Sequence, residues 1–316
     1  MRAAVIVNKS LEVQDRPDPV PGMGELLVRV RAAGLNNADL MQIQGGYPAP
    51  PGSPADIPGL ELAGEVAAVG PGVFRYRVGD RVMAVVGGGA LAELAVVHER
   101  TAMPVPANVS WEAAGGFPEA FTTAHDAMFT QCGLLMGEHV CVHGAAGGVG
   151  MAAVQLAAAA GASVVATVRN EAIRPMVEAL AQGAVHAVNP EVFGTHGPFD
   201  VILELIGASN LSANLSALNI GGRITVIGVG GTGGRGEIDL LALMLKRARI
   251  HGSTLRARPL EQKADAAARL EKQVLPAFAS GKLQVPIVAT HPLQEVNDAY
   301  GRFTAGAKFG KIVVIP

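Results

Sequence analysis

The chain has 316 residues, of which 49% are hydrophobic and 16% are charged, and its formal net charge is −2. This length is sufficient for two domains, and the composition excludes an extended disordered chain, which would be charge-rich and poor in apolar residues. A small negative charge without any run of Lys or Arg, together with only 4% aromatic residues, argues against a nucleic-acid-binding surface.

The N-terminal residues do not resemble a secretory signal, because a short apolar run gives way to polar residues and no cleavage-like site follows. The most apolar helix candidate, 147–160, has about 14 residues, whereas a membrane span needs about 20. We therefore expect a soluble, cytoplasmic protein. In that reducing compartment, Cys132 and Cys141 are expected to be free and largely buried thiols.

Residues 1–120 predict a mainly β domain. Short runs of strand-forming residues, separated by Gly and Pro turns, cover 2–7, 25–33, 61–69, 81–86 and 90–97. Long connections join these runs, including a Pro-rich loop at 47–58. This pattern favours an antiparallel sheet with one buried face, or a partly open barrel.

From about residue 110 the chain alternates helix-forming segments with continuous apolar strands. The strand candidates are 139–144, 163–169, 185–189, 199–206 and 223–228. Strands that are apolar on both faces are typical of a parallel sheet that is covered by helices on each side. The segments between them, such as 148–160 and 171–182, are good helix formers, so this part is predicted to be a doubly wound α/β domain.

The last part of the chain combines a helical stretch near 260–280, a helix at 293–304 and a final strand at 311–315. The apolar end of this strand needs a sheet to join, so we expect the tail to fold back onto the first domain. The expected domain boundaries are therefore 1–120, completed by 287–316, for the mainly β domain and 121–286 for the α/β domain.

The strongest chemical motif is HVCVHGAAGGVG at 139–150, in which a strand ends, a tight glycine turn follows and an apolar helix begins. Glycines let backbone N–H groups approach a pyrophosphate, and the helix N-terminus offers free donors and a positive dipole to that anion. The pattern is AxGxxG, with an alanine where many dinucleotide-binding folds have their first glycine. The sequence therefore predicts a dinucleotide site with contacts from Ala145, Gly147, Gly148, Val149 and Gly150.

The end of the next strand indicates which dinucleotide binds. An NAD enzyme usually places Asp or Glu about 20 residues after the glycines, where it holds the ribose 2′-hydroxyl. Here Arg169 and Asn170 end the strand, and Arg174 follows in the next helix. An Arg can bind a 2′-phosphate through several donors, so the sequence favours NADPH. The alternative is that Arg169 is only a solvated residue at a strand end.

Several short motifs follow one another along nearly the whole chain. They are AGLNNAD at 33–39, QGGYP at 44–48, PGLELAG at 58–64, VGDRV at 78–82, FPEA at 117–120 with TA at 123–124, the glycine turn, and GKIVV at 310–314. In these motifs the chain resembles the medium-chain dehydrogenase/reductase superfamily and, within it, the zinc-free, zeta-crystallin-type NADPH:quinone oxidoreductases. The resemblance implies a GroES-like catalytic domain formed by both chain ends, a Rossmann domain between them, and a cofactor in the cleft between the two.

The motifs lack the zinc ligands of the alcohol dehydrogenases in this superfamily. Those enzymes carry a Cys after the first Ala-Gly pair and a His in a Gly-His-Glu motif. Here the segment 35–39 has no cysteine, Leu60 stands in place of the His, and the four-cysteine lobe for structural zinc is missing. Because catalytic zinc needs three protein ligands, we predict a zinc-independent enzyme.

Reduction of a quinone needs less assistance than reduction of a ketone, because hydride addition gives a stabilised hydroquinone anion. Hydrogen-bond donors near the acceptor oxygen should suffice. By resemblance, Asn36 and Tyr47 line the nicotinamide and acceptor pocket, and the Tyr47 hydroxyl can protonate a reduced acceptor. Tyr47 could instead pack on the prolines around it. Asp39 is expected to orient this loop, and Glu61 either lies beside the cleft or serves in structural pairing.

The resemblance implies further cofactor contacts, which are Thr123, Ile227, Gly228, Val229 and Lys311. It also leaves a rival activity open, the reduction of an enoyl thioester or enone. Enoyl-thioester reductases have a basic residue after the second strand and a functional Tyr in a QGxY-like segment. A thioester carrying CoA or a carrier protein would need basic residues at the mouth of the cleft, and the loop 47–58 has none, which favours a small quinone.

Two further expectations concern the molecule as a whole. A non-catalytic NADPH-binding protein is an alternative of another class, because a fold does not fix a function. A homodimer is implied by the resemblance, and the apolar segment 248–253 is expected at a sheet edge where it could meet its two-fold mate.

Overall fold

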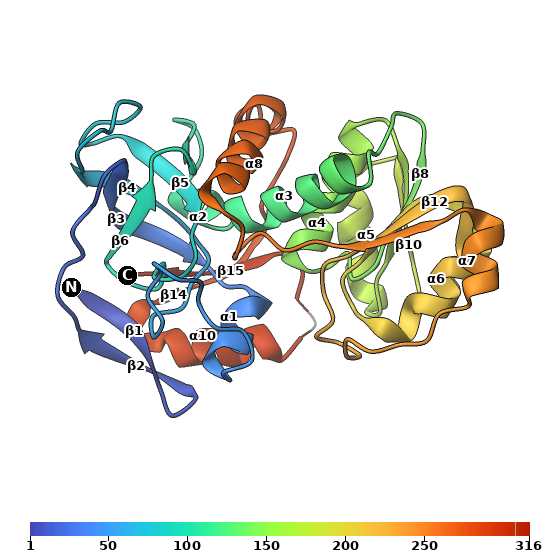
Figure 1. Cartoon of the computed structure of the whole chain (residues 1–316), viewed down its shortest axis with the longest axis horizontal. Helices are drawn as coiled ribbons and strands as arrows, with labels where there is room; N and C mark the ends of the chain where they lie inside the picture. Colours follow the sequence, from blue (N-terminus) through green and yellow to red (C-terminus); the bar gives the residue numbers. More distant parts are fainter. Residues whose placement is uncertain (307) are drawn as a thin grey trace. The chain divides into compact units, whose positions relative to one another are not determined.

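Two units make up the structure, a computed structural model that describes residues 1–306 and 308–316. The first unit comprises Met1–Thr122, Leu255–Gly306 and Gly310–Pro316, so both ends of the chain contribute to it. The second unit is built on Thr123–Thr254. Figure 1 shows the first unit as rich in strands and the second as a sheet with helices around it.

A seven-stranded, mostly antiparallel sheet forms the centre of the first unit, in the order β14-β15-β3-β4-β5-β7, with β6 also paired to β3. The strands are β3 (Glu25–Gly34), β4 (Glu61–Val69), β5 (Arg81–Val85), β6 (Leu94–His98), β7 (Ala102–Pro104), β14 (Ile287–Pro292) and β15 (Lys311–Ile315). The last strand, β15, pairs antiparallel with β3 through Val313 and Gly34, which confirms that the tail returns to the first unit.

A separate hairpin precedes this sheet. β1 (Arg2–Val7) and β2 (Ser10–Asp15) are joined by Asn8 and Lys9, whose φ angles are 49° and 64°. Two-residue loops with positive φ at both positions match the twist of the flanking strands, which is why this connection makes a hairpin. The strand β2 is absent from the sequence expectation, because its polar and charged residues hide the alternating pattern.

The helices of the first unit come from three parts of the chain. They are α1 (Asn37–Ile43), α2 (Trp111–Gly115), α8 (Leu260–Gln273), α9 (Leu275–Ala279) and α10 (Val296–Thr304), while α3 (Pro118–His125) runs across the boundary at Thr122. The expected helix at 260–280 is therefore two helices, and the expected helix at 293–304 begins with a 3₁₀ turn (Leu293–Glu295).

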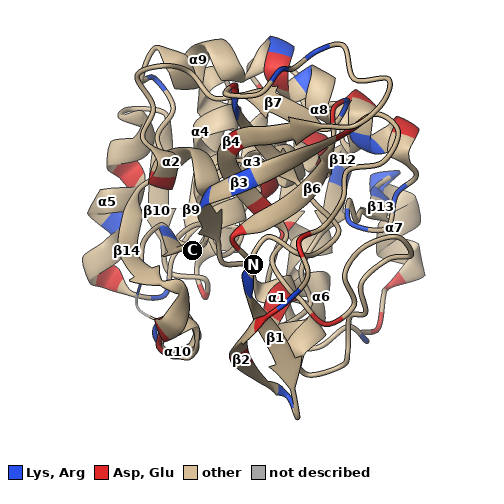
Figure 2. Ribbon diagram, turned by 90° about the vertical axis from the view of Figure 1, so that its left-hand side faces the viewer, with Lys and Arg blue, Asp and Glu red and all other residues tan. Residues whose placement is uncertain are grey.

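The segment 255–286 belongs to the first unit, whereas the sequence pattern places it in the α/β domain. Phe278 of α9 stacks on Phe117 with ring centroids 4.2 Å apart. From α8, Glu261 forms an ion pair with Arg100 at 2.6 Å. Figure 2 shows acidic and basic residues close together along the ribbon around α8. These contacts join residues far apart in the chain, so local periodicity does not reveal them.

The second unit contains a six-stranded parallel sheet in the order β10-β9-β8-β11-β12-β13, as expected for a doubly wound α/β domain. The strands are β8 (His139–Val142), β9 (Ser163–Thr167), β10 (Val185–Val188), β11 (Phe199–Glu204), β12 (Leu218–Val226) and β13 (Arg249–Gly252). The helices are α4 (Gly148–Ala159), α5 (Arg174–Glu178), α6 (Leu211–Ala217) and α7 (Leu240–Lys246). β13 is the edge strand, which confirms the edge position expected for 248–253.

The helix expected at 171–182 is interrupted. A 3₁₀ turn (Glu171–Ile173) leads into the short α5, and a second 3₁₀ turn (Ala179–Ala181) follows. Pro175 stands in the first turn of α5, where its missing N–H does no harm, but it prevents one continuous helix from forming across this point.

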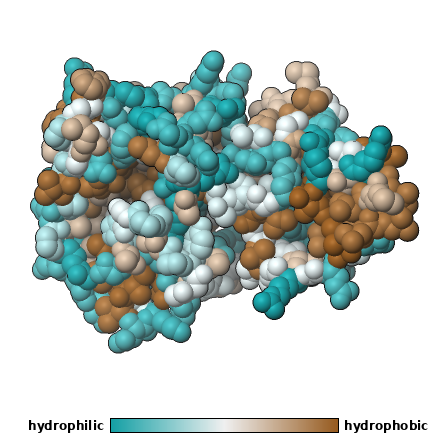
Figure 3. Space-filling model, in the orientation of Figure 1, coloured by the Kyte–Doolittle hydropathy of each residue, from teal (hydrophilic) through white to brown (hydrophobic). Residues whose placement is uncertain are grey.

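Apolar surface is unevenly distributed. In the second unit, α7 exposes large aliphatic side chains, among them Leu240 (69% exposed) and Leu245 (67% exposed), and Figure 3 shows the apolar surface there. Within the described ranges no helix is long and apolar enough to cross a membrane. Cys132 and Cys141 are free, buried thiols, as expected.

Candidate active site

The glycine turn lies between β8 and α4 and has the geometry that an anion site requires. Gly144 adopts φ +66°, and a side chain at Gly150 would meet the Gly144 carbonyl oxygen at 2.4 Å, so the turn and the helix pack backbone to backbone. Above Gly147, by contrast, a side chain would meet only that carbonyl oxygen, at 3.5 Å. The first amides of α4 have no acceptor within the helix, so Gly148 and Val149 offer N–H groups at its positive end.

A second turn adjoins this edge of the sheet. Ile227 and Gly228, which follow β12, donate their N–H groups to the Glu204 carbonyl oxygen at 2.9 and 3.3 Å. A side chain at Gly228 would lie 2.5 Å from the Leu205 oxygen, so only glycine allows this approach. Because β11 alone separates β8 from β12 in the parallel sheet, the glycine turn and residues 227–229 lie at the same carboxyl edge, where doubly wound folds bind nucleotides.

A buried network of hydrogen bonds holds the backbone at the start of the glycine turn. His143 contacts Thr167 Oγ1 through Nδ1 at 3.1 Å and Asn214 Oδ1 through Nε2 at 2.7 Å. Thr167 Oγ1 accepts from the Gly144 N–H at 3.2 Å, and Asn214 donates to Glu204 Oε2 at 2.8 Å. Burial lowers the pKa of His143. The network ties the strand ends together through neutral hydrogen bonds and one carboxylate.

Glu204 has a second role in this network. Its Oε1 accepts from the N–H groups of Ile206 and Gly207, at 2.6 and 2.9 Å, and so shapes the turn after β11. The sequence expectation assigns no role to Glu204 or Asn214. A buried carboxylate at the end of an apolar strand is the signal that could have singled out Glu204.

The end of β9 carries two guanidinium groups with different surroundings. Arg169 is exposed and has no partner among the described residues. Arg174 donates from Nε to the Val168 carbonyl oxygen at 3.1 Å, which holds it against the strand end. The Asn170 side chain accepts from the Ala172 N–H at 3.1 Å and so caps the following turn. The donors that remain for a 2′-phosphate are therefore chiefly those of the two arginines.

The remaining cofactor candidate of the second unit, Thr123, is buried on α3. Val229 is 39% exposed in the turn after β12. Thr123, residues 227–229, the glycine turn and the residues after β9 are the expected cofactor contacts that belong to the second unit.

In the first unit, two expected site residues, Asn36 and Lys311, form one cluster with the buried Glu61. The Lys311 ammonium lies 2.5 Å from Glu61 Oε1 and donates to Asn36 Oδ1 at 2.9 Å and to the Leu35 carbonyl oxygen at 2.8 Å. Asn36 donates to Glu61 Oε1 at 3.0 Å, and the Glu119 N–H donates to Glu61 Oε2 at 2.9 Å. Lys311 therefore uses three donors inside this cluster, and the structure places Glu61 in structural pairing.

Asp39 orients the start of α1, as expected. Its Oδ2 accepts from the Asn36 N–H at 2.8 Å, while Oδ1 has no hydrogen-bond partner and the Tyr300 phenol lies nearby without a well-formed hydrogen bond. Burial raises the pKa of Asp39 to about 6, against the favourable effects of the Asn36 N–H and of Lys311.

Tyr47 differs from Asn36 in having a free functional group. The Asn36 amide nitrogen is engaged by Glu61 and by the Gly34 carbonyl oxygen, at 3.0 and 3.2 Å. The half-buried Tyr47 has no hydrogen-bond partner for its hydroxyl among the described residues. Its ring lies beneath the guanidinium of Arg256, at 5.0 Å from Cζ to the ring centroid. Arg256 is not among the site residues that we expect from the sequence, because no motif near Tyr47 in the chain indicates it.

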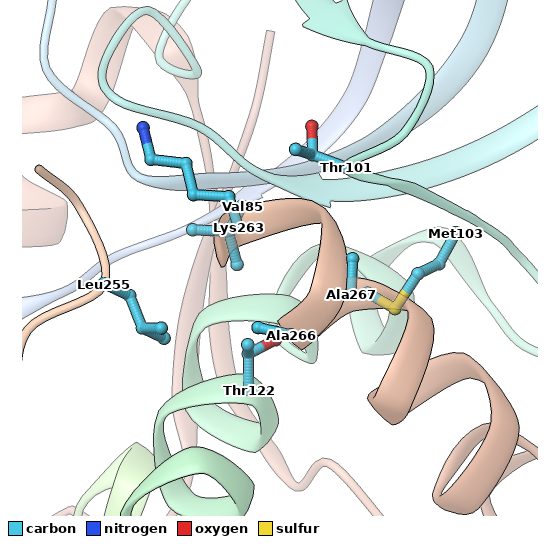
Figure 4. A pocket seen from close by; sticks show the side chains of 8 residues that line it. All are labelled: Val85, Thr101, Met103, Thr122, Leu255, Lys263, Ala266 and Ala267. Atoms are coloured by element: carbon cyan, nitrogen blue, oxygen red, sulfur yellow. The ribbon is translucent and has the colours of Figure 1, made fainter. Parts of the chain in front are cut away.

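The first unit also contains two hollows, and neither Asn36 nor Tyr47 lines them. The smaller, shown in Figure 4, has a volume of about 20 Å³, enough for one water molecule but not for a substrate. The larger is a groove of about 730 Å³ whose walls include the proline loop Pro50–Pro54, the glycines Gly87–Gly89, Arg258 and Lys263.

The positions of the zinc ligands in related alcohol dehydrogenases hold other residues here. Leu60, which stands in place of the His, is 1% exposed and belongs to the apolar core. Over residues 1–306 and 308–316, no group of three or more His, Cys, Asp or Glu side chains is placed to hold a metal ion.

The chain thus combines a β unit made from both chain ends with an α/β unit that has a glycine turn at its strand ends, the architecture of a two-domain nucleotide-binding protein. Two family models match the chain, the alcohol dehydrogenase GroES-like domain over residues 22–107 and the zinc-binding dehydrogenase over 148–272. The quinone oxidoreductase of Lama guanicoe is 32% identical over 310 residues, covering 94% of this chain and 90% of the relative.

Solved structures agree with these matches. An alcohol dehydrogenase superfamily protein from Novosphingobium aromaticivorans is 28% identical with a TM-score of 0.88, covering 100% of this chain and 99% of its own. A quinone oxidoreductase from Pseudomonas syringae is 27% identical with a TM-score of 0.87, covering 100% and 98%. The chain belongs to the medium-chain dehydrogenase/reductase superfamily. Within it, the relatives of this chain include quinone oxidoreductases.

Proposed function

We propose that the protein is a zinc-independent, NADPH-dependent quinone reductase that transfers hydride from the nicotinamide to a small quinone. The observation that carries the proposal is the Tyr47 hydroxyl, which has no partner among the described residues. The unit to which it belongs has Leu60 in place of the zinc-binding His and no cysteine in the segment 35–39. The unit therefore offers a hydrogen-bond donor, rather than a metal, to a reduced acceptor. The relatives named quinone oxidoreductase support the choice of acceptor.

The chemistry divides between cofactor and protein. The nicotinamide supplies the hydride when it is bound. Tyr47 donates a hydrogen bond to the acceptor oxygen on which negative charge develops, and then its proton. The cluster of Asn36, Glu61 and Lys311 holds the start of α1, after which the Tyr47 loop begins. A direct contact of Asn36 or Lys311 with substrate or cofactor remains a proposal, and it requires one of these internal hydrogen bonds to be exchanged.

The preference for NADPH rests on the end of β9. Arg169 has no partner among the described residues, so its donors are free to bind a 2′-phosphate. Arg174 is held by the Val168 carbonyl oxygen, so it loses less conformational freedom when it binds the same group. No carboxylate stands at the strand end itself to hold a 2′-hydroxyl. Asn170 is proposed to contribute through its backbone, because its side chain caps the next turn.

One observation favours a second candidate, the reduction of an enoyl thioester or enone. The loop 47–58 has no Lys or Arg of its own, but Lys263 and Arg258 line the groove that Pro50–Pro54 also lines. Burial and the charge of Arg256 lower the pKa of Lys263. A carrier with phosphate groups could use these cations, so the lack of basic residues within the loop does not by itself exclude a thioester.

A homodimer is part of the proposal. The edge strand β13 leaves one side of the parallel sheet open, and α7 beside β12 exposes Leu240, Leu241 and Leu245. A two-fold contact of such surfaces would cover both the open edge and the apolar side chains.

An acceptor panel tests the function. Purified protein is mixed with NADPH or NADH and with a benzoquinone, a naphthoquinone, an orthoquinone or crotonyl-CoA, and the loss of reduced cofactor is followed by absorbance. Turnover of a quinone with a preference for NADPH supports the first candidate. Turnover of crotonyl-CoA alone supports the second. Tight NADPH binding with no turnover of any acceptor would make a non-catalytic protein the better account.

A further inference from the structure

A single buried guanidinium joins three separate segments of the first unit. Arg256 is 4% exposed. Its Nε donates to the Gly87 carbonyl oxygen at 2.9 Å, Nη1 donates to the Tyr47 carbonyl oxygen at 2.9 Å, and Nη2 donates to Gln42 Oε1. Gln42 in turn donates to the Ala55 carbonyl oxygen at 3.0 Å. Arg256 therefore ties the end of α1 and both ends of the Tyr47 loop to the glycine segment after β5.

All of these acceptors are neutral. No carboxylate among the described residues forms an ion pair with Arg256, and burial lowers its pKa. A buried cation without a directly paired carboxylate is costly, and hydrogen bonds to neutral oxygens offset only part of that cost. The positive charge itself therefore needs an explanation.

The Arg256 guanidinium lies against the aromatic ring of Tyr47. The Arg256 Cζ lies 5.0 Å from the ring centroid, a cation–π contact, and the same guanidinium holds the Tyr47 carbonyl oxygen. One group thus contacts both the side chain and the backbone of Tyr47, which restricts where the ring lies. A proton donor whose position is fixed in this way is ready for transfer without further ordering.

A cation at this distance also stabilises the phenolate relative to the phenol. Burial raises the pKa of Tyr47, the charge of Arg256 lowers it, and the charge of Glu119 on α3 raises it again. Asp39 on α1 interacts with Arg256 and reduces its effect when ionised. Of these groups, only Arg256 favours release of the proton.

We propose that Arg256 is a positioning residue that fixes the Tyr47 ring and stabilises the tyrosinate left behind when Tyr47 gives its proton to a reduced acceptor. In that step the Tyr47 O–H bond breaks and a new O–H bond forms on the acceptor oxyanion; solvent later returns a proton to the phenolate. The catalytic part rests on the proposed function, whereas the coupling between Arg256 and Tyr47 does not.

A tyrosinate titration tests the coupling without any turnover. The chain has only three tyrosines. Burial raises the pKa of Tyr76 strongly, and that of Tyr300 lies well above its ordinary value. Tyr47 should therefore ionise first when the ultraviolet absorbance of tyrosinate is followed against pH, and loss of this first transition in Tyr47→Phe would assign it.

Arg256→Met should raise the pKa of that first transition by about one to two units, because it removes the cation and keeps the bulk of the side chain. Arg256→Lys, which keeps the charge but not the planar fork, should restore much of the difference. Arg258→Met, a loss of charge on the same segment, should leave the transition unchanged. An unaltered pKa of Tyr47 in folded Arg256→Met would overturn the proposal.

Gln42→Glu keeps the test informative if Arg256→Met fails to fold. The new carboxylate stands where the amide oxygen accepts from Arg256, so the guanidinium stays in place while its charge is offset. The pKa of Tyr47 should again rise, and an unchanged value would contradict the proposed coupling.

Turnover then separates this proposal from the proposed function. With a quinone acceptor, Arg256→Met should lower kcat about tenfold in the wild-type background and have no further effect in the Tyr47→Phe background, as expected when one residue acts through another. Equal losses in both backgrounds would contradict the positioning role. If the titration shows coupling but no acceptor is reduced, the coupling stands and the proposed function fails.

Discussion

The Lys311 ammonium donates to Asn36 Oδ1 at 2.9 Å, across 275 positions of sequence, so the last strand of the chain fixes the side chain that precedes α1. Glu61 completes the cluster and is fully buried, and Lys311 is 3% exposed. Removing one partner of such a buried ion pair strongly destabilises the folded state, because the other charge stays buried without compensation.

Lys311→Met should therefore lower the free energy of unfolding by about 3–5 kcal/mol, measured by urea denaturation. The double variant Lys311→Met/Glu61→Gln is the control, since it also removes the orphaned carboxylate and should recover part of that loss. If the single and double variants were equally stable, the Glu61 charge would not be the cause.

Asp39 predicts a dependence of stability on pH. Its pKa is about 6 in the folded protein against an ordinary value of 3.8. Below pH 3.8 the Asp39 carboxyl is protonated in both the folded and the unfolded state, so it does not change the free energy of unfolding. Between pH 3.8 and about 6 it ionises in the unfolded state but stays protonated in the folded state, so the folded state is progressively destabilised. Above pH 6 this destabilisation amounts to about 3 kcal/mol.

Asp39→Asn removes this ionisation and keeps an acceptor for the Asn36 N–H. Relative to the wild-type protein, the variant should gain stability between acid and neutral pH, with unfolding by urea measured at both. A constant difference between the two proteins at all pH values would argue against the raised pKa.

Arg169→Ala tests the choice of cofactor. The Arg169 side chain is exposed and has no partner among the described residues, so its removal should leave the fold intact. Loss of one charge-assisted contact to a 2′-phosphate should raise the Kd for NADPH about 10- to 100-fold and leave NADH binding unchanged. Calorimetric titration with both cofactors measures this directly. A parallel loss for both would indicate a general effect on the site and not recognition of the phosphate.

The apolar surface of α7 predicts an association. Leu241→Glu places a charge on a residue that is 59% exposed, and it should shift a dimer to a monomer in light scattering after size-exclusion chromatography. Phe74→Glu is the matched control, because Phe74 is 91% exposed in the first unit. A wild-type protein that is monomeric at all concentrations would rule out the proposed homodimer.

Much of the fold can be predicted from the sequence, because its strands and turns depend on residues that are close together in the chain. The parallel strands of the second unit are continuous apolar runs, and the glycine turn between β8 and α4 contains its own conformational requirements at Gly144 and Gly150. The return of β15 to the first sheet follows from an apolar strand that needs a partner. These features depend on neighbours along the chain.

The rest of the site depends on contacts between residues far apart. Arg256 and Tyr47 are 209 positions apart, and no local pattern links them. The same holds for Phe278 on Phe117, which assigns the segment 255–286 to the first unit. Lys311 belongs to the GKIVV motif, yet only the fold shows that its donors are engaged by Asn36 and Glu61.

The central claim is that Tyr47 assists hydride transfer from NADPH to a quinone without a metal. The most direct measurement is kcat for a naphthoquinone with NADPH in the wild-type protein and in Tyr47→Phe, with NADPH binding measured for both. We predict turnover by the wild-type protein that persists in the presence of a metal chelator, and a kcat at least about 100-fold lower in Tyr47→Phe with unchanged Kd for NADPH. Equal turnover by the two proteins, or no turnover of any quinone, would contradict the account.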